Sequence, residues 1–104
     1  MEIKIPSKEE FLKYLNSDRV VIDFNAKWCG PCRMLSPVLE EIAEEDPELV
    51  VLKVDTDDFN DLAYEYHVSS IPALFYVKNG KVVNQTVGFM PKAQLQNTIK
   101  QILG

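Results

Sequence analysis

Residues 20–32 read Val-Val-Ile-Asp-Phe-Asn-Ala-Lys-Trp-Cys-Gly-Pro-Cys, and they join a mostly apolar run to a pair of cysteines. The first six residues predict a strand at residues 20–25 that is covered on both faces of a sheet. Asp23 interrupts this apolar run, six residues before Cys29. Because a buried carboxylate is costly unless it is paired or protonated, its position suggests a link to the chemistry of the cysteines.

Cys29 and Cys32 form a C-x-x-C pair at the predicted start of a helix. Helix neighbours at this spacing have Cβ atoms about 5 to 6 Å apart, so a disulfide needs only a modest adjustment. Pro31 suits the first helical position, and the unpaired backbone N–H groups of that turn favour a thiolate at Cys29. We therefore predict a reversible disulfide in which Cys29 is the attacking nucleophile.

Cys32 lies one turn further along the helix, so we expect it to be less exposed and to act as the resolving thiol. Its attack on the mixed disulfide between Cys29 and a substrate requires a thiolate. We expect burial to raise the pKa of Asp23, so that this carboxylate takes up a proton near neutral pH, directly or through a water. Lys53 on a neighbouring strand is expected to offset part of that rise. The alternative is that Asp23 is a buried acid with satisfied hydrogen bonds and no role in turnover.

A C-x-x-C pair is also half of a zinc site. Tetrahedral zinc needs about four ligands, whereas the chain has two cysteines and one distant histidine, His67. We therefore predict no metal. His67 follows a short predicted helix and is interpreted as a helix-end or packing residue, not a catalyst.

The length, charge and hydrophobicity of the chain predict its domain number and exclude some classes of partner. A chain of 104 residues with 46% apolar residues predicts one domain, residues 1–104, with a single real core. Sixteen acidic against eleven basic residues give a net charge of -5, which argues against nucleic-acid binding. No secretory signal and no run of roughly 18 apolar residues is present, so we expect a soluble intracellular protein with no membrane partner.

The hydrophobic pattern predicts an α/β fold. Strands are expected at residues 3–5, 20–25, 49–54, 73–78 and 81–87, and helices at 7–15, 31–45, 59–66 and from Pro91 onward. Asn79-Gly80 predicts a tight hairpin turn, because both central residues of a type I′ turn need positive φ. Strand-helix-strand crossovers imply parallel pairing, and the hairpin adds antiparallel strands. The result is a central mixed five-stranded sheet flanked by four helices.

Trp28-Cys29-Gly30-Pro31-Cys32, together with Ile71-Pro72, Lys78-Asn79-Gly80 and Val87-Gly88, makes the chain resemble the thioredoxin family over essentially its whole length. The resemblance implies a thioredoxin fold, with Cys29 as the nucleophile, Cys32 as the resolving thiol and Asp23 as the buried acid that assists it. It also implies that electrons come from thioredoxin reductase, a separate flavoprotein that uses NADPH. No cofactor is therefore expected on this chain.

The resemblance also assigns a substrate-docking surface. Ile71-Pro72 matches the family's cis-proline, where the backbone beside the cysteines pairs with a substrate; from the residues alone, an ordinary trans proline ending a loop is the other reading. Gly88 matches a glycine that leaves room for that substrate, against simple loop geometry. Trp28 is expected to cover the cysteines and to join the docking surface, against a role in packing only.

Two features concern redox tuning. Gly30 and Pro31 resemble the reducing members of the superfamily, since oxidising isomerases commonly carry a histidine between the cysteines. Asn25 stands where the family usually has an aromatic residue, and Lys27 where it often has an acidic or small one, so the redox potential and the reductase preference stay open. Phe89 and Met90 follow Gly88, where the family often has a small residue. They either enlarge an apolar docking patch or pack within their loop.

Taken together, these features predict a cytoplasmic, monomeric protein-disulfide reductase that acts on disulfide-containing proteins. The alternative is a non-catalytic binding subunit or accessory factor built on the same fold.

Overall fold

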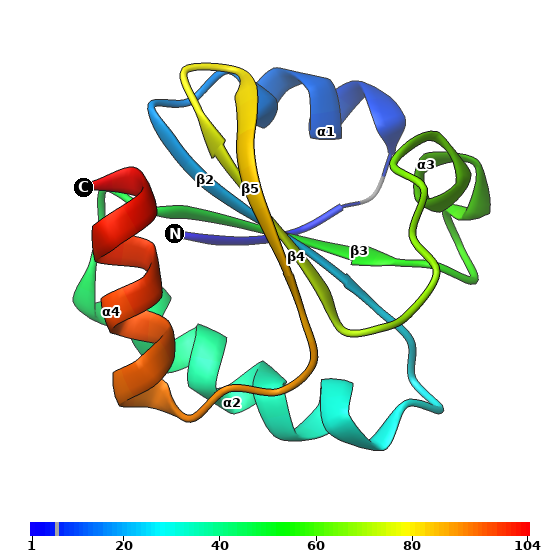
Figure 1. The fold of residues 1–104 in the computed structure, drawn as a ribbon. Helices are drawn as coiled ribbons and strands as arrows, with labels where there is room; N and C mark the ends of the chain where they lie inside the picture. Colours follow the sequence, from blue (N-terminus) through cyan, green and yellow to red (C-terminus); the bar gives the residue numbers. More distant parts are fainter. Residues whose placement is uncertain (6) are drawn as a thin grey trace.

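The computed structural model describes residues 1–5 and 7–104, and the order of its elements is the predicted one (Figure 1). The strands are β1 (Glu2–Lys4), β2 (Arg19–Asn25), β3 (Val50–Asp55), β4 (Ala73–Lys78) and β5 (Lys81–Val87). The helices are α1 (Lys8–Leu15), α2 (Gly30–Glu45), α3 (Asn60–Glu65) and α4 (Lys92–Leu103).

The five strands form one mixed sheet in the order β1-β3-β2-β4-β5. β3 pairs in parallel with both β1 and β2, whereas β4 runs antiparallel to β2 and β5 antiparallel to β4. The prediction of a mixed five-stranded sheet with four helices is confirmed, and β2, which carries Asp23, is the middle strand.

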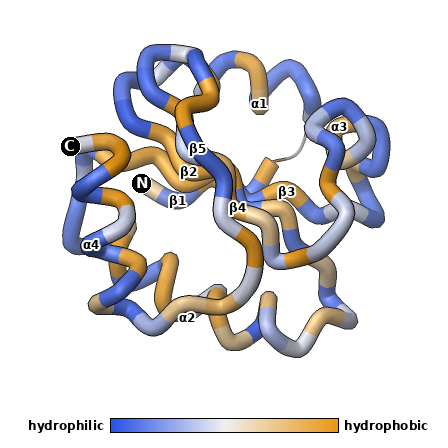
Figure 2. Tube along the Cα trace, viewed as in Figure 1, coloured by the Kyte–Doolittle hydropathy of each residue, from blue (hydrophilic) through white to orange (hydrophobic). Residues whose placement is uncertain are grey.

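Helices cover both faces of the sheet, with α1 and α3 on one side and α2 and α4 on the other (Figure 1). The two large apolar clusters follow this division. One contains Leu39 of α2 and Leu95 of α4, and the other contains Phe11 of α1 and Leu62 of α3. Figure 2 shows the hydrophobic residues concentrated along the central strands and the hydrophilic ones toward the outer turns and helix surfaces. β2 is therefore buried on both faces, as its apolar pattern predicts.

Local signals explain several boundaries. The Ser7 side chain accepts a hydrogen bond from the Glu10 backbone N–H and caps α1, and Asn79 and Gly80 have φ values of 52° and 81°, as the predicted hairpin turn requires. Several predicted boundaries were wrong by one residue. The first strand ends at Lys4 instead of Ile5, although the Ile5 N–H still bonds the Lys53 carbonyl at 3.2 Å, and Pro91 is the N-cap of α4 instead of a residue of its first turn.

The fold brings two loops to one end of the sheet. β2 leads to Cys29 at the start of α2, and the cis bond between Ile71 and Pro72 precedes β4. No helix in the described part of the chain is long and apolar enough to cross a membrane.

Candidate active site

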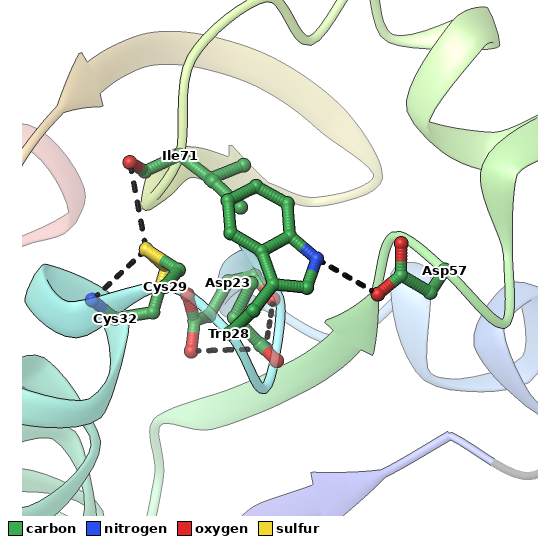
Figure 3. Close-up of a disulfide and its surroundings, with 7 residues drawn as sticks. Asp23, Trp28, Cys29, Cys32, Asp57 and Ile71 are labelled. Carbon is green, nitrogen blue, oxygen red and sulfur yellow. Dashed lines mark hydrogen bonds between the residues drawn. A yellow bond between two sulfur atoms is a disulfide. The ribbon is translucent and has the colours of Figure 1, made fainter.

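Cys29 and Cys32 form a disulfide at the N-terminus of α2, with their Cα atoms 5.3 Å apart (Figure 3). Cys29 is the N-cap residue, and its Sγ accepts a hydrogen bond from the backbone N–H of Cys32 at 3.2 Å. Gly30 and Pro31 occupy the first turn between them. The sulfur of Cys29 therefore lies where free N–H groups and the positive end of the helix dipole stabilise negative charge.

The structure contradicts the expected difference in exposure between the two cysteines. Both residues are 5% exposed, because the closed pair packs as a unit against Ala26 and the partly buried Ile71. Exposure in the oxidised form therefore does not distinguish the nucleophile from the resolving thiol. The hydrogen bond to Cys29 Sγ does distinguish them.

Asp23 is buried, with 2% of its surface exposed. Burial raises its pKa to about 7, and the positive charge of Lys53 offsets part of this rise, as expected from the sequence. The Asn25 side chain donates to Asp23 Oδ2 at 3.4 Å, whereas Asp23 Oδ1 has no hydrogen-bond partner in the described part of the chain.

Asp23 and Cys32 line the same small cleft. Its volume is about 120 Å³, and its wall also includes Ser36 and Lys53. A cleft of this size is large enough for water, which would carry a proton between the two side chains without direct contact between them.

Lys53 lies beside Asp23 in the register of β2 and β3, but its ammonium group binds elsewhere. Lys53 Nζ donates to Ser36 Oγ at 2.6 Å and lies 3.9 Å from Glu2 Oε1. Among residues 1–5 and 7–104, no ion pair joins Lys53 to Asp23.

The loop before β4 lies against the disulfide. The bond between Ile71 and Pro72 is cis, and Cys29 Sγ lies 3.8 Å from the Ile71 carbonyl oxygen (Figure 3). Gly88 donates its N–H to the Pro72 carbonyl at 2.8 Å, and its φ of 98° is one that glycine adopts readily. Space is open where a Cβ at Gly88 would lie, so loop geometry explains this glycine and the site beside it is unobstructed.

Trp28 is 71% exposed, and its indole N–H donates to Asp57 Oδ2 at 3.0 Å (Figure 3). In the interior, Ala26 and Ile71 pack against the cysteine pair. The exposed ring of Trp28 remains available to a partner.

The structure also shows the positions of Met90, Phe89 and His67. Met90 is buried in the core beneath α4, so packing explains it, whereas Phe89 is 38% exposed. His67 follows α3 with a φ of 55°, and its backbone N–H bonds the Tyr64 carbonyl, which confirms a helix-end residue. Within the described ranges, no three His, Cys, Asp or Glu side chains are grouped to hold a metal ion.

Comparison with known proteins identifies the family. The thioredoxin family profile matches residues 2–101. The chain belongs to the thioredoxin family. It is 46% identical to a thioredoxin of Chlamydia trachomatis over 99 residues, which cover 95% of this chain and 97% of that one. It is 38% identical to a thioredoxin of Mycoplasmoides gallisepticum over 97 residues, covering 92% and 97%. A thioredoxin variant from Halobacterium salinarum has the same fold, with a TM-score of 0.91 at 33% identity, covering 99% and 91%.

A thioredoxin that keeps both cysteines is a thiol-disulfide oxidoreductase, and this chain has the pair as a disulfide. Its activity is reduction of protein disulfides by dithiol-disulfide exchange.

Four contacts at the site were not predicted from the sequence. Asp57 binds the indole of Trp28, and Ser36 and Glu2 bind the ammonium of Lys53. Asn25, noted only as a departure from thioredoxins, is a hydrogen-bond donor to Asp23. The polar character of Asn25 beside Asp23 was the one signal available for its role, and the other contacts join residues that are distant in the sequence.

Proposed function

We propose that the chain reduces disulfides in other proteins through Cys29, Cys32 and Asp23, each with a separate role. The Cys29 thiolate attacks one sulfur of a substrate disulfide, forms a mixed disulfide and releases the other sulfur as a thiolate, which takes a proton from solvent. Cys32 then attacks Cys29 Sγ and releases the second substrate thiol. Two electrons pass to the substrate, and the pair becomes the disulfide seen in the structure.

The observation that carries this assignment is the hydrogen bond from the Cys32 backbone N–H to Cys29 Sγ. In the reduced protein the same donor stabilises a Cys29 thiolate, and it offers nothing comparable to Cys32 Sγ. Cys29 is therefore the thiol that is ionised before a substrate arrives.

Asp23 is the proton acceptor for Cys32 in this proposal. A pKa of about 7 leaves a useful fraction of Asp23 ionised at neutral pH, and the shared cleft provides a route for the proton. The pKa is also close enough to that of a thiol for transfer to be easy.

The docking surface consists of Trp28, Ile71, Pro72 and Gly88 in this proposal. The Ile71 carbonyl lies beside Cys29 Sγ, and Gly88 leaves the adjacent space open, so an extended substrate segment can approach the sulfur from this side. The exposed indole of Trp28 adds apolar contact area.

Gly30, Pro31 and Lys53 tune the redox pair in this proposal. Gly30 and Pro31 place no charged or titratable group between the cysteines, so the thiolate gains only the support of the helix N-terminus. The dithiol then remains a good reductant, since strong extra stabilisation of the thiolate makes a pair more oxidising.

The partners that we propose are disulfide-containing proteins and a thioredoxin reductase that regenerates the dithiol. We further propose that residues 1–104 act as a single thioredoxin domain, as a monomer, in the cytoplasm. A reductant pair needs a compartment in which thiols are kept reduced, which the cytoplasm provides.

Reduction of insulin disulfides by dithiothreitol tests the proposal. The protein is expected to accelerate the reaction, and Cys29→Ser is expected to abolish the acceleration. A rate equal to that of dithiothreitol alone would contradict catalysis and support the alternative, a binding subunit on the same fold. Circular dichroism of both proteins confirms that they are folded.

A further inference from the structure

Three charged side chains form a row across the sheet beneath α2. Asp23 on β2 pairs in register with Lys53 on β3, and Lys53 pairs with Lys4 on β1. Glu2 is two residues before Lys4, so it points to the same face as Lys53 and Asp23. Lys4 is on the same face but is exposed, so the more buried groups of the row are two carboxylates with the Lys53 ammonium between them.

The ammonium of Lys53 binds partners other than Asp23. It donates to Ser36 Oγ of α2 at 2.6 Å and lies 3.9 Å from Glu2 Oε1. Both ends of the Glu2–Lys53 pair are mostly covered, with 22% of each side chain exposed, so solvent screens their attraction only partly. Two anchors thus hold the cation, and neither of them is Asp23.

Each carboxylate has one oxygen that nothing in the described part of the chain binds. Glu2 Oε2 and Asp23 Oδ1 are both buried and without a hydrogen-bond partner. Burial raises the pKa of both carboxylates, and Lys53 offsets only part of each rise, so ionisation of both at once is disfavoured. A proton taken up by the row relieves this cost.

We propose that Glu2 is a positioning residue for the reaction: it draws the Lys53 ammonium away from Asp23 and so keeps Asp23 able to accept the proton of Cys32 at neutral pH. This inference rests on the proposed role of Asp23. Without Glu2, Lys53 swings toward Asp23, pairs with it and leaves a carboxylate that is a weaker base.

The other charged groups near the row act on Glu2 or at the mouth of the cleft. Glu40 and Glu44 of α2 raise the pKa of Glu2, and Lys53 and the amino group of Met1 lower it, while burial raises it most. Asp23 faces Lys53, Glu2 and the Asn25 side chain, and Lys27 and Arg33 line the cleft that it shares with Cys32. Among these groups, only Lys53 is a cation that lies between the two carboxylates.

Titration of the Asp23 carboxyl by carbon-13 NMR in the oxidised protein tests the proposal, because no thiol titrates in that form. Glu2→Gln preserves the shape of the side chain and removes its charge. We expect it to lower the Asp23 midpoint by about 0.5 pH unit or more. Glu9→Gln, an exposed position on α1, is the matched control and is expected to leave the midpoint unchanged. An unchanged midpoint in Glu2→Gln would overturn the proposal.

Repeating the substitution in a Lys53→Met background separates positioning of the lysine from direct repulsion between the carboxylates. If Glu2 acts through Lys53, the shift caused by Glu2→Gln shrinks to a minor part of its value in that background. An equal shift in both backgrounds would contradict the proposal. Amide spectra report whether each variant is folded.

Two further readouts complete the test. Coupling is reciprocal, so Asp23→Asn is expected to lower the titration midpoint of Glu2, and no change there would count against a shared ammonium. In the reduced enzyme, Glu2→Gln is expected to move the pH profile of resolution by Cys32 to lower pH. Failure of the proposed function would instead appear as absent insulin reduction in the unsubstituted protein, whatever the NMR midpoints are.

Discussion

Asp23 and Lys53 are paired in the register of β2 and β3, yet the Lys53 ammonium binds Ser36 Oγ at 2.6 Å, and Asp23 Oδ1 has no hydrogen-bond partner among residues 1–5 and 7–104. A lysine that neutralised Asp23 fully would make it an ordinary ionised carboxylate. Burial, offset only in part by Lys53, raises the pKa of Asp23 to about 7, a value that suits the proton-acceptor role proposed above.

Asp23→Asn is expected to stabilise the fold, and more so at high pH. The folded-state pKa of Asp23 is raised to about 7 from 3.8, so the folded protein binds its proton more tightly than the unfolded chain, and stability falls as pH rises toward 7. Removing the ionisable group is expected to raise the free energy of unfolding by about 4 kcal/mol at pH 8 and by about 2 kcal/mol at pH 5. Urea unfolding at both values measures the gain.

Glu9→Gln is a suitable control for this stability experiment, because its carboxylate is exposed and is expected to change stability by less than about 0.5 kcal/mol. A gain in Asp23→Asn that is the same at both pH values would show that the carboxylate does not carry the stated pKa shift.

The rate at which Cys32 resolves a mixed disulfide is expected to rise between pH 6 and pH 8, with a midpoint near the pKa of Asp23 of about 7. Only ionised Asp23 accepts a proton, so the rate increases as Asp23 loses its own. Asp23→Asn is expected to slow resolution at neutral pH roughly 10- to 100-fold. Stopped-flow release of a peptide thiol attached to Cys29 measures it, and a rate independent of pH over this range would reject the proton-acceptor role.

Asn25→Ala is expected to raise the titration midpoint of Asp23. The Asn25 amide donates to Asp23 Oδ2, which favours the ionised carboxylate, so its loss favours the protonated form. Carbon-13 NMR of the Asp23 carboxyl measures the shift. Asn97→Ala on the exposed surface of α4 is the control, and a midpoint in Asn25→Ala equal to that control would mean that the hydrogen bond has no electrostatic effect.

Asp57→Ala is expected to free the indole of Trp28 while changing stability by less than about 1 kcal/mol, since the broken hydrogen bond is exposed. Trp28 is the only tryptophan, so its fluorescence anisotropy reports the motion without interference. Lower anisotropy is the expected result, together with a higher KM for protein disulfides. Asp58→Ala provides a neighbouring control, and equal anisotropy in the two variants would show that the bond does not fix the ring.

Cys32→Ser is expected to accumulate a mixed disulfide with insulin through Cys29, because the second step of the exchange is removed. Non-reducing electrophoresis followed by peptide mass mapping identifies the linked cysteine. The mirror variant, Cys29→Ser, is expected to trap far less. The opposite pattern would reverse the order of attack.

Most of the fold follows from local sequence signals. The apolar run of residues 20–25 predicts a central strand, and Asn79-Gly80 predicts the hairpin, because each signal is set by backbone or burial preferences of neighbouring residues. Burial of Asp23 and the rise in its pKa were also predictable, because both faces of its strand are covered and its side chain therefore points into the protein on either face.

Contacts between distant segments were not predictable. Glu2 lies 51 positions before Lys53, and Ser36 reaches it from a helix whose orientation depends on the packed core. The equal burial of Cys29 and Cys32 depends on the loop at Ile71, and the burial of Met90 depends on α4. Periodicity describes which face of an element is covered, but it does not describe which side chain from another element meets it.

Titration of the Cys29 thiol in the reduced protein, followed by thiolate absorbance in a Cys32→Ser background, tests the central claim most directly. We predict a Cys29 pKa at least about one unit below the value of about 8.5 for a free cysteine. The N-terminus of α2 and the backbone N–H of residue 32, which the Cys32→Ser substitution keeps, both stabilise the thiolate. A Cys29 pKa at or above that of free cysteine would contradict the assignment of Cys29 as the attacking thiolate.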